Sequence, residues 1–186
     1  IWEVIYKMVS LRKAAAYSKK KARPFTRKSG QKSQSYIKAV PVSKIVKFTM
    51  GDQKSFNEKK HKFVLKLVAD EKVQIRDNAL EAGRMLINKV LDTDAPGQYF
   101  MAVKVYPHHV LRENKLAAGA GADRLSSGMT HSYGQNVGRA AIVGYGKEIF
   151  FISALNEKTI KVARKALDMV KAKVPCKTRV VFEKLA

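Results

Sequence analysis

The sequence predicts an α+β fold, a two-layer sandwich in which two helices cover one face of a mixed, mainly antiparallel sheet. Two observations carry this prediction. Strand-like runs flank a helix-like run twice, around Asn78–Leu91 and around Asn156–Ala172. Both helix-like runs are amphipathic, so each needs a sheet face against which its apolar stripe can be buried. A long glycine-rich loop is expected to leave one end of this sandwich.

In the first half of the chain, alternating apolar residues predict strands over Lys44–Met50 and Phe63–Ala69, with a polar loop over Asp52–Lys62 between them. The inward face of the first strand is expected to carry Val46, Phe48 and Met50. The helix over Asn78–Leu91 follows, with Asn78 and Glu81 as a capping pair. Its apolar stripe comprises Leu80, Gly83, Ile87, Val90 and Leu91. The carboxylates around this helix predict an acidic side that faces away from nucleic acid.

In the second half, Tyr99–Tyr106 alternates as a strand before the loop. Strands over Arg139–Gly144 and Glu148–Ala154 follow the loop, and Tyr145-Gly146-Lys147 between them predicts a hairpin. Asn156 is expected to cap the second helix, which Pro175 ends. The last strand is expected to direct Thr178, Val180 and Phe182 inward.

The composition indicates a folded protein with an anionic partner. The 186 residues suffice for one domain with an apolar core. The chain has 37 Lys and Arg against 15 Asp and Glu, a formal net charge of +22, and such an excess points to nucleic acid. The single cysteine, Cys176, excludes an intrachain disulfide and fits a reducing compartment, so we expect it to be a packing residue. No apolar run reaches the roughly 18 residues of a membrane helix, and no membrane partner is expected.

Composition also divides the chain. Residues 1–7 precede Met8, and we interpret them as a non-native upstream leader or, alternatively, as a small docking segment. Residues 8–34 form a basic N-terminal extension, and residues 35–186 a single α+β domain with a protruding loop over residues 107–138.

The extension contains no carboxylate, and aromatic residues are interleaved with its cations. A block of like charge orders only against a counter-charge, and aromatic rings can stack on bases. We therefore assign the extension to RNA binding; the alternatives are a solvated tail or a targeting signal. Its candidate residues are Arg12, Lys13, Tyr17, Lys19, Lys20, Lys21, Arg23, Arg27, Lys28 and Lys32.

The stretch from Tyr106 to Gly138 is too long for a tight turn, and loops of this length are usually functional or disordered. Its glycines and cations suit insertion into a crowded anionic environment. The residues of this stretch do not match a nucleotide-binding loop or a metal site. The run from Gly119 to Arg124 lacks the Gly-Lys-Ser/Thr of a phosphate loop. His108 and His109 would point to opposite faces of a strand, one packed and one toward RNA, and could not bind one metal ion together.

Three segments carry a resemblance to a known family: VPVSKI at 40–45, YPHHVLRENK at 106–115 and GAGADRLSSGM at 119–129. From about Leu11 to its C-terminus the chain resembles the large-subunit ribosomal protein family called L-ten-e in archaea and eukaryotes, universally uL-sixteen, and it looks archaeal. The resemblance implies a cytoplasmic ribosomal protein that is a structural constituent of the large subunit, without enzymatic activity or a cofactor. It does not extend to the basic residues that the family usually has at two positions, where this chain has Thr130 and Gln135.

The resemblance also implies partners and sites. The partners would be large-subunit rRNA, tRNA and neighbouring ribosomal proteins, and the protein would not be a stand-alone homo-oligomer. To the rRNA-binding residues of the extension it adds Lys44, His109 and Arg139. The loop would reach toward tRNA and the peptidyl-transferase centre, supporting tRNA accommodation and subunit maturation. Its base would be Arg112, Asn114 and Lys115, and its tip Leu116, Ala117, Ala118, Gly119, Ala120, Gly121, Ala122, Asp123 and Arg124.

Two alternatives stay open on the residues alone. A nucleic-acid-coating protein without sequence preference would explain the charge, although it would not need the long loop. A small RNA-processing hydrolase would need clustered carboxylates or metal ligands, and the chain has carboxylates in number only around its first helix.

Overall fold

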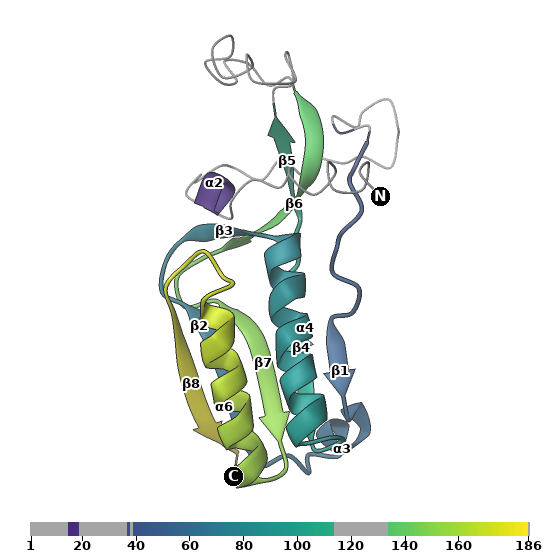
Figure 1. Ribbon diagram of the computed structural model, residues 1–186, viewed down its shortest axis with the longest axis vertical. Helices are drawn as coiled ribbons and strands as arrows, with labels where there is room; N and C mark the ends of the chain where they lie inside the picture. The colour runs from purple at the N-terminus through teal and green to yellow at the C-terminus, as the bar shows by residue number, and fades with distance from the viewer. Residues whose placement is uncertain (1–14, 19–36, 38, 114–133, 186) are drawn as a thin grey trace, which may run out of the picture.

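The computed structural model describes residues 15–18, 37, 39–113 and 134–185, and shows two helices packed on one face of a sheet (Figure 1). The elements, in chain order, are α2 (Ala15–Ser18), β1 (Thr49–Gly51), α3 (Gln53–Asn57), β2 (Phe63–Ala69), β3 (Val73–Arg76), α4 (Asp77–Asp94), β4 (Tyr99–Val103), β5 (His109–Glu113), β6 (Gln135–Val143), β7 (Glu148–Ala154), α6 (Glu157–Lys171) and β8 (Thr178–Lys184).

The strands form two sheets rather than the single mixed sheet that we expected. The larger sheet has five strands in the order β1-β4-β7-β2-β8, and the smaller has three in the order β3-β6-β5. Every strand pair in the described part of the chain is antiparallel. Helices α4 and α6 lie side by side across the larger sheet, and the smaller sheet continues from one end of this sandwich (Figure 1). The α+β, two-layer prediction is therefore confirmed.

The core lies between the helices and the larger sheet, where Phe150 on β7 is fully buried. The helix side of the core contributes Leu80, Ile87, Leu91, Ala163, Leu167 and Val170. Gly83 of α4 allows the close approach, because a Cβ there would lie 2.9 Å from the Phe150 ring. A larger residue at position 83 would have to displace this fully buried ring or move the helix away from the sheet.

The opposite face of the larger sheet is covered in part by α3, which the sequence analysis treated as loop. Asp52 caps this helix by accepting hydrogen bonds from the backbone N–H groups of Lys54 and Ser55, both at 3.1 Å. The helix places Phe56 on Phe100, with ring centroids 4.3 Å apart and nearly parallel planes. Strand β4, on which Phe56 packs, is buried along its whole length.

Several local predictions are wrong. Of the predicted strand over Lys44–Met50, only Thr49 and Met50 belong to β1, and Val46 is 75% exposed. Phe182, expected to point inward, is 50% exposed. Tyr145-Gly146-Lys147 does not close a hairpin, since β6 and β7 belong to different sheets. Asn78 lies inside α4 and does not cap it, whereas Asn156 is the N-cap residue of α6 as predicted but makes no capping bond with its side chain. No helix in the described ranges is both long and apolar enough to cross a membrane.

Candidate nucleic-acid interface

The predicted RNA-binding extension touches the described structure at α2. This short helix packs against β3, where the Arg76 guanidinium lies over the Tyr17 ring at 5.4 Å from its centroid. Tyr17 is half-buried there. The ring that we assigned to RNA is therefore in contact with the smaller sheet and anchors the extension to it. The cations assigned to the extension lie outside the described residues.

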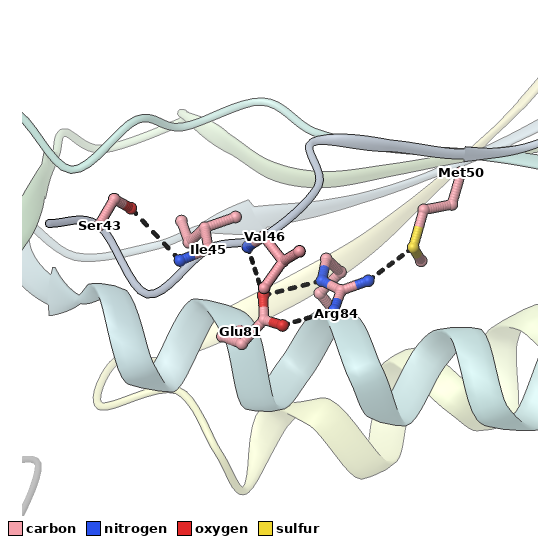
Figure 2. Close-up of polar contacts among 6 residues, drawn as sticks. All are labelled: Ser43, Ile45, Val46, Met50, Glu81 and Arg84. Carbon is pink, nitrogen blue, oxygen red and sulfur yellow. Dashed lines mark hydrogen bonds and ion pairs between the residues drawn. The ribbon is translucent and has the colours of Figure 1, made fainter.

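The segment that leads from the extension into β1 is fastened to the first turns of α4 (Figure 2). The backbone N–H of Lys44 donates to Asp77 at 3.0 Å, and the N–H of Val46 donates to Glu81 at 3.4 Å. Asp77 is 4% exposed, and Ile45 between the two bonds is buried. These bonds fix the backbone of Lys44 while its side chain stays exposed, which suits a predicted contact to RNA.

Glu81 is the centre of a second set of contacts rather than the cap partner of Asn78. Its carboxylate accepts hydrogen bonds from Nε and Nη2 of Arg84. The remaining guanidinium nitrogen, Nη1, donates to the sulfur of Met50 at 2.6 Å (Figure 2). The bond from Arg84, followed by the charge of Arg84 and the bond from Val46, holds the pKa of the Glu81 carboxyl below its usual value. Asp77 and Glu81 therefore attach the segment before β1 to α4. This structural role is separate from the predicted repulsion of nucleic acid by these carboxylates.

The ends of the glycine-rich loop are paired strands of the smaller sheet. Glu113 of β5 lies opposite Gln135 of β6, and an irregularity in the register follows Leu111. Strand β6 begins at Gln135 instead of the predicted Arg139. Arg112 is half-buried on β5 and lies opposite Asn136. Asn114, Lys115 and the predicted tip, residues 116–124, lie outside the described residues.

His108 and His109 have opposite environments, as the sequence analysis expected. His108 is exposed, whereas His109 is 7% exposed at the start of β5. Burial, aided by the nearby charge of Arg112, lowers the pKa of His109, so its ring is neutral at pH 7. Of the pair, His108 is therefore the ring that faces solvent, and the assignment of His109 to rRNA stays a prediction.

Arg139 emerges on the same sheet, half-buried, and donates a hydrogen bond from Nη1 to the Tyr106 hydroxyl at 3.2 Å. The tyrosine is 44% exposed and was not among the predicted site residues. The sequence analysis also missed the exposed cationic face of α6. Its members are Lys158, Lys161, Arg164 and Lys165.

The chemistry of this end of the molecule is that of binding. Arginines lie on the small sheet and the rings of Tyr106 and His108 lie in the segment that leads into it, and within the described ranges no group of three His, Cys, Asp or Glu side chains is placed to hold a metal ion. Comparison with known proteins gives the family. A family model described as ribosomal protein L16p/L10e matches residues 21–181. The chain belongs to this family. The resemblance stated from the sequence segments is thereby confirmed, and the family is a structural component of the ribosome rather than an enzyme.

Curated relatives agree along almost the whole length. The large ribosomal subunit protein uL16 of Staphylothermus marinus is 41% identical over 176 residues, which cover 94% of this chain and 95% of the relative. The protein of the same name from Archaeoglobus fulgidus is 39% identical over 174 residues, covering 93% and 94%. That of Pyrobaculum calidifontis is 40% identical over 173 residues, covering 92% and 93%. The archaeal character inferred from the sequence fits these relatives.

Proposed function

We propose that this protein is a structural constituent of the large ribosomal subunit. It binds rRNA through its N-terminal extension and its three-stranded sheet, and it holds the glycine-rich loop between β5 and β6 near tRNA and the peptidyl-transferase centre. Through that loop it supports tRNA accommodation and late subunit maturation. Neighbouring large-subunit proteins are its other partners.

One observation supports the RNA-binding part of this proposal most directly. The extension and the loop, which are far apart in the sequence, are attached to the same small sheet. Tyr17 of α2 contacts Arg76 of β3, and Asn136 of β6 donates to the carbonyl of Ala39. The cation-rich extension and the glycine-rich loop thus start from the same end of the sandwich, so one RNA surface can contact both.

The mechanism is electrostatic anchoring by a scaffold. Lys and Arg side chains neutralise phosphates and release counterions, which supplies affinity without reading sequence. The larger sheet and its two helices support the smaller sheet, and the paired strands β5 and β6 of the smaller sheet fix the two ends of the loop. The protein contributes position and charge, and the chemistry of translation belongs to its partners.

Sedimentation of the tagged full-length chain from a lysate tests this proposal. Comigration with the large subunit, resistant to DNase and lost after RNase, is the expected result. Sedimentation with DNA would favour the nucleic-acid-coating alternative, and migration at low mass would contradict the ribosomal assignment. A control in which Lys158, Lys161, Arg164 and Lys165 of α6 are changed to Gln measures how much of the comigration follows from surface charge alone.

A further inference from the structure

Three aromatic rings form a connected group at the junction of the two sheets. The rings of Phe48 and Tyr106 are stacked, with centroids 5.4 Å apart and planes 23° from parallel. Tyr106 also contacts the ring of His108, at 4.5 Å between centroids. Phe48 packs against the core, Tyr106 is 44% exposed and His108 is exposed. The group therefore runs from the core to the surface, and its outer rings face solvent.

The backbone holds these rings in place. The N–H of His108 donates to the carbonyl of Tyr106 at 3.0 Å, which closes a three-residue turn around buried Pro107. Proline fixes its own φ at a value that such a turn accepts, so the rings on either side keep their relation. Phe48 is held by its carbonyl, which accepts from the N–H of Val103 at 2.8 Å. A prearranged aromatic surface loses little conformational entropy when it binds a flat partner.

The surroundings favour an anionic partner. The segments that supply the rings, residues 37–51 and 99–112, contain no Asp or Glu, and neither does the stretch 134–147 that supplies Arg139. Arg139 donates to the Tyr106 hydroxyl, which leaves the hydroxyl proton available for an acceptor. Lys47, next to Phe48, is exposed. Flat rings with adjacent cations and a hydrogen-bond donor are the features that bind unpaired bases in RNA.

We propose that Phe48, Tyr106 and His108 form a stacking platform for one unpaired nucleobase of RNA, with Tyr106 and His108 as the rings in contact. The proposal rests on the RNA-binding function proposed above and adds to it a preference for an extruded base over a continuous duplex. Arg139 positions Tyr106 and can approach the adjacent phosphate.

The test uses two hairpin RNAs with the same number of nucleotides, each containing one 2-aminopurine. In one RNA this base is paired with uracil in the stem, and in the other it is bulged. The full-length protein is expected to bind the bulged RNA about 5- to 100-fold more tightly, which corresponds to the stacking of one base on an aromatic side chain. The fluorescence of the bulged base should fall on binding, because stacking quenches it.

Four variants separate stacking from charge and from folding. Tyr106→Leu and His108→Ala should each remove most of the preference for the bulged RNA, while the affinity for the paired RNA stays within about twofold because phosphate contacts supply it. Tyr106→Phe keeps a ring and should keep most of the preference. Tyr145→Leu is the matched control, since Tyr145 is 65% exposed and also has an arginine, Arg179, near its ring at 6.0 Å. It should change neither affinity.

Thermal midpoints of all four variants accompany the titrations, and the exposed His108→Ala variant decides the matter if Tyr106→Leu unfolds. Equal affinity of the unmodified protein for the two RNAs, or a preference that survives both ring deletions, would overturn the stacking platform and leave the ribosomal function standing. Failure of the unmodified protein to bind either RNA would overturn both proposals.

Discussion

The two sheets of this protein differ in how their faces are used. In the larger sheet, β2 and β4 are almost entirely buried; α4 and α6 cover one face of the sheet, and Phe56 of α3 packs on Phe100 and Phe151 of the other. In the smaller sheet, β6 leaves large apolar side chains in contact with solvent, with Val137 38% and Ile142 45% exposed. The larger sheet therefore holds most of the burial that stabilises the fold. The smaller sheet holds the attachment points of the extension and the loop and the half-buried Arg76, Arg112 and Arg139, and the exposed rings of Tyr106 and His108 lie just before its strand β5. This separation predicts that stability and RNA binding can be changed independently.

The largest expected effect is a loss of stability when the core of the larger sheet is changed. Phe150→Ala should lower the free energy of unfolding by about 3–5 kcal/mol, because it removes a fully buried ring between α4, α6 and the sheet. Ile142→Ala, on the exposed face of β6, should cost less than about 1 kcal/mol. Urea denaturation of both variants measures the two values. Similar losses for the two variants would show that the smaller sheet is as important to stability as the larger one.

A second pair of variants tests the close approach of α4 to the sheet. Gly83→Ala should destabilise the fold by about 1–2 kcal/mol, since the clash with Phe150 exceeds the gain in helix propensity. Gly138→Ala on β6 is the control, because an added Cβ there meets nothing within 4 Å. Denaturation midpoints are the measurement. A stabilised Gly83→Ala variant would mean that the helix can move away from the ring at little cost.

The third prediction concerns pH. Burial lowers the pKa of His61, partly offset by the Asp52 charge, and it lowers that of His109 as well. Each folded pKa lies below the unfolded value of 6.5, so below that pH the unfolded chain binds more protons. Stability should be full above about pH 7 and should fall as the pH drops through 6 toward 5.

The control for this prediction is His108, the exposed one of the three histidines in the described part of the chain. His61→Gln should flatten the loss of stability between pH 7 and pH 5, and His108→Gln should leave it unchanged. The carboxylates Asp52 and Glu81 have lowered pKa values, so their contributions are lost at more acidic pH. A stability that rises on acidification to pH 5 would contradict the sign of the argument.

The smallest effect is expected at the single cysteine. Cys176 is half-buried against the core, and burial, together with the charges of Glu71 and Asp70, raises the pKa of its thiol to about 11. About one thiol in a thousand is then ionised at pH 8, so alkylation should be at least about tenfold slower than in the urea-unfolded chain. Cys176→Ser should leave growth and assembly nearly unchanged. Rapid alkylation of the folded protein would show a reactive thiol.

Residue patterns recovered the parts of the fold that depend on local periodicity. The bounds of β2 and β7 match the predicted strands, and the predicted stripe of the first helix includes Leu80, Gly83 and Ile87, all buried. The stretch before β1 was misassigned because the N–H groups of Lys44 and Val46 bond to Asp77 and Glu81 of α4 instead of to a strand, and these long-range partners leave no local signal.

The connection between β6 and β7 was misassigned for a similar reason. Its glycine turn has the composition of a hairpin, yet the N–H of Gly146 donates to the carbonyl of Ala69 at 2.8 Å, and Lys147 accepts from the N–H of Ala69 at 3.0 Å. The turn is thus bonded to the end of β2. At the candidate site, the alternation of His108 and His109 was predictable from strand geometry. Which of the two rings is buried depends on the packing of the smaller sheet, which periodicity does not specify.

The central claim is that the sandwich is a scaffold and that the loop acts on translation. Deletion of residues 117–122 tests it most directly, because these small side chains offer little apolar area to the core. The measurement is the peptide-synthesis rate of large subunits that carry the deleted protein, with its thermal midpoint and its incorporation into subunits as controls. The account predicts a folded protein with a midpoint within a few degrees of the full chain, normal incorporation and slow peptide synthesis or late stalling of maturation. Normal synthesis by fully incorporated subunits, or unfolding of the deleted protein, would contradict it.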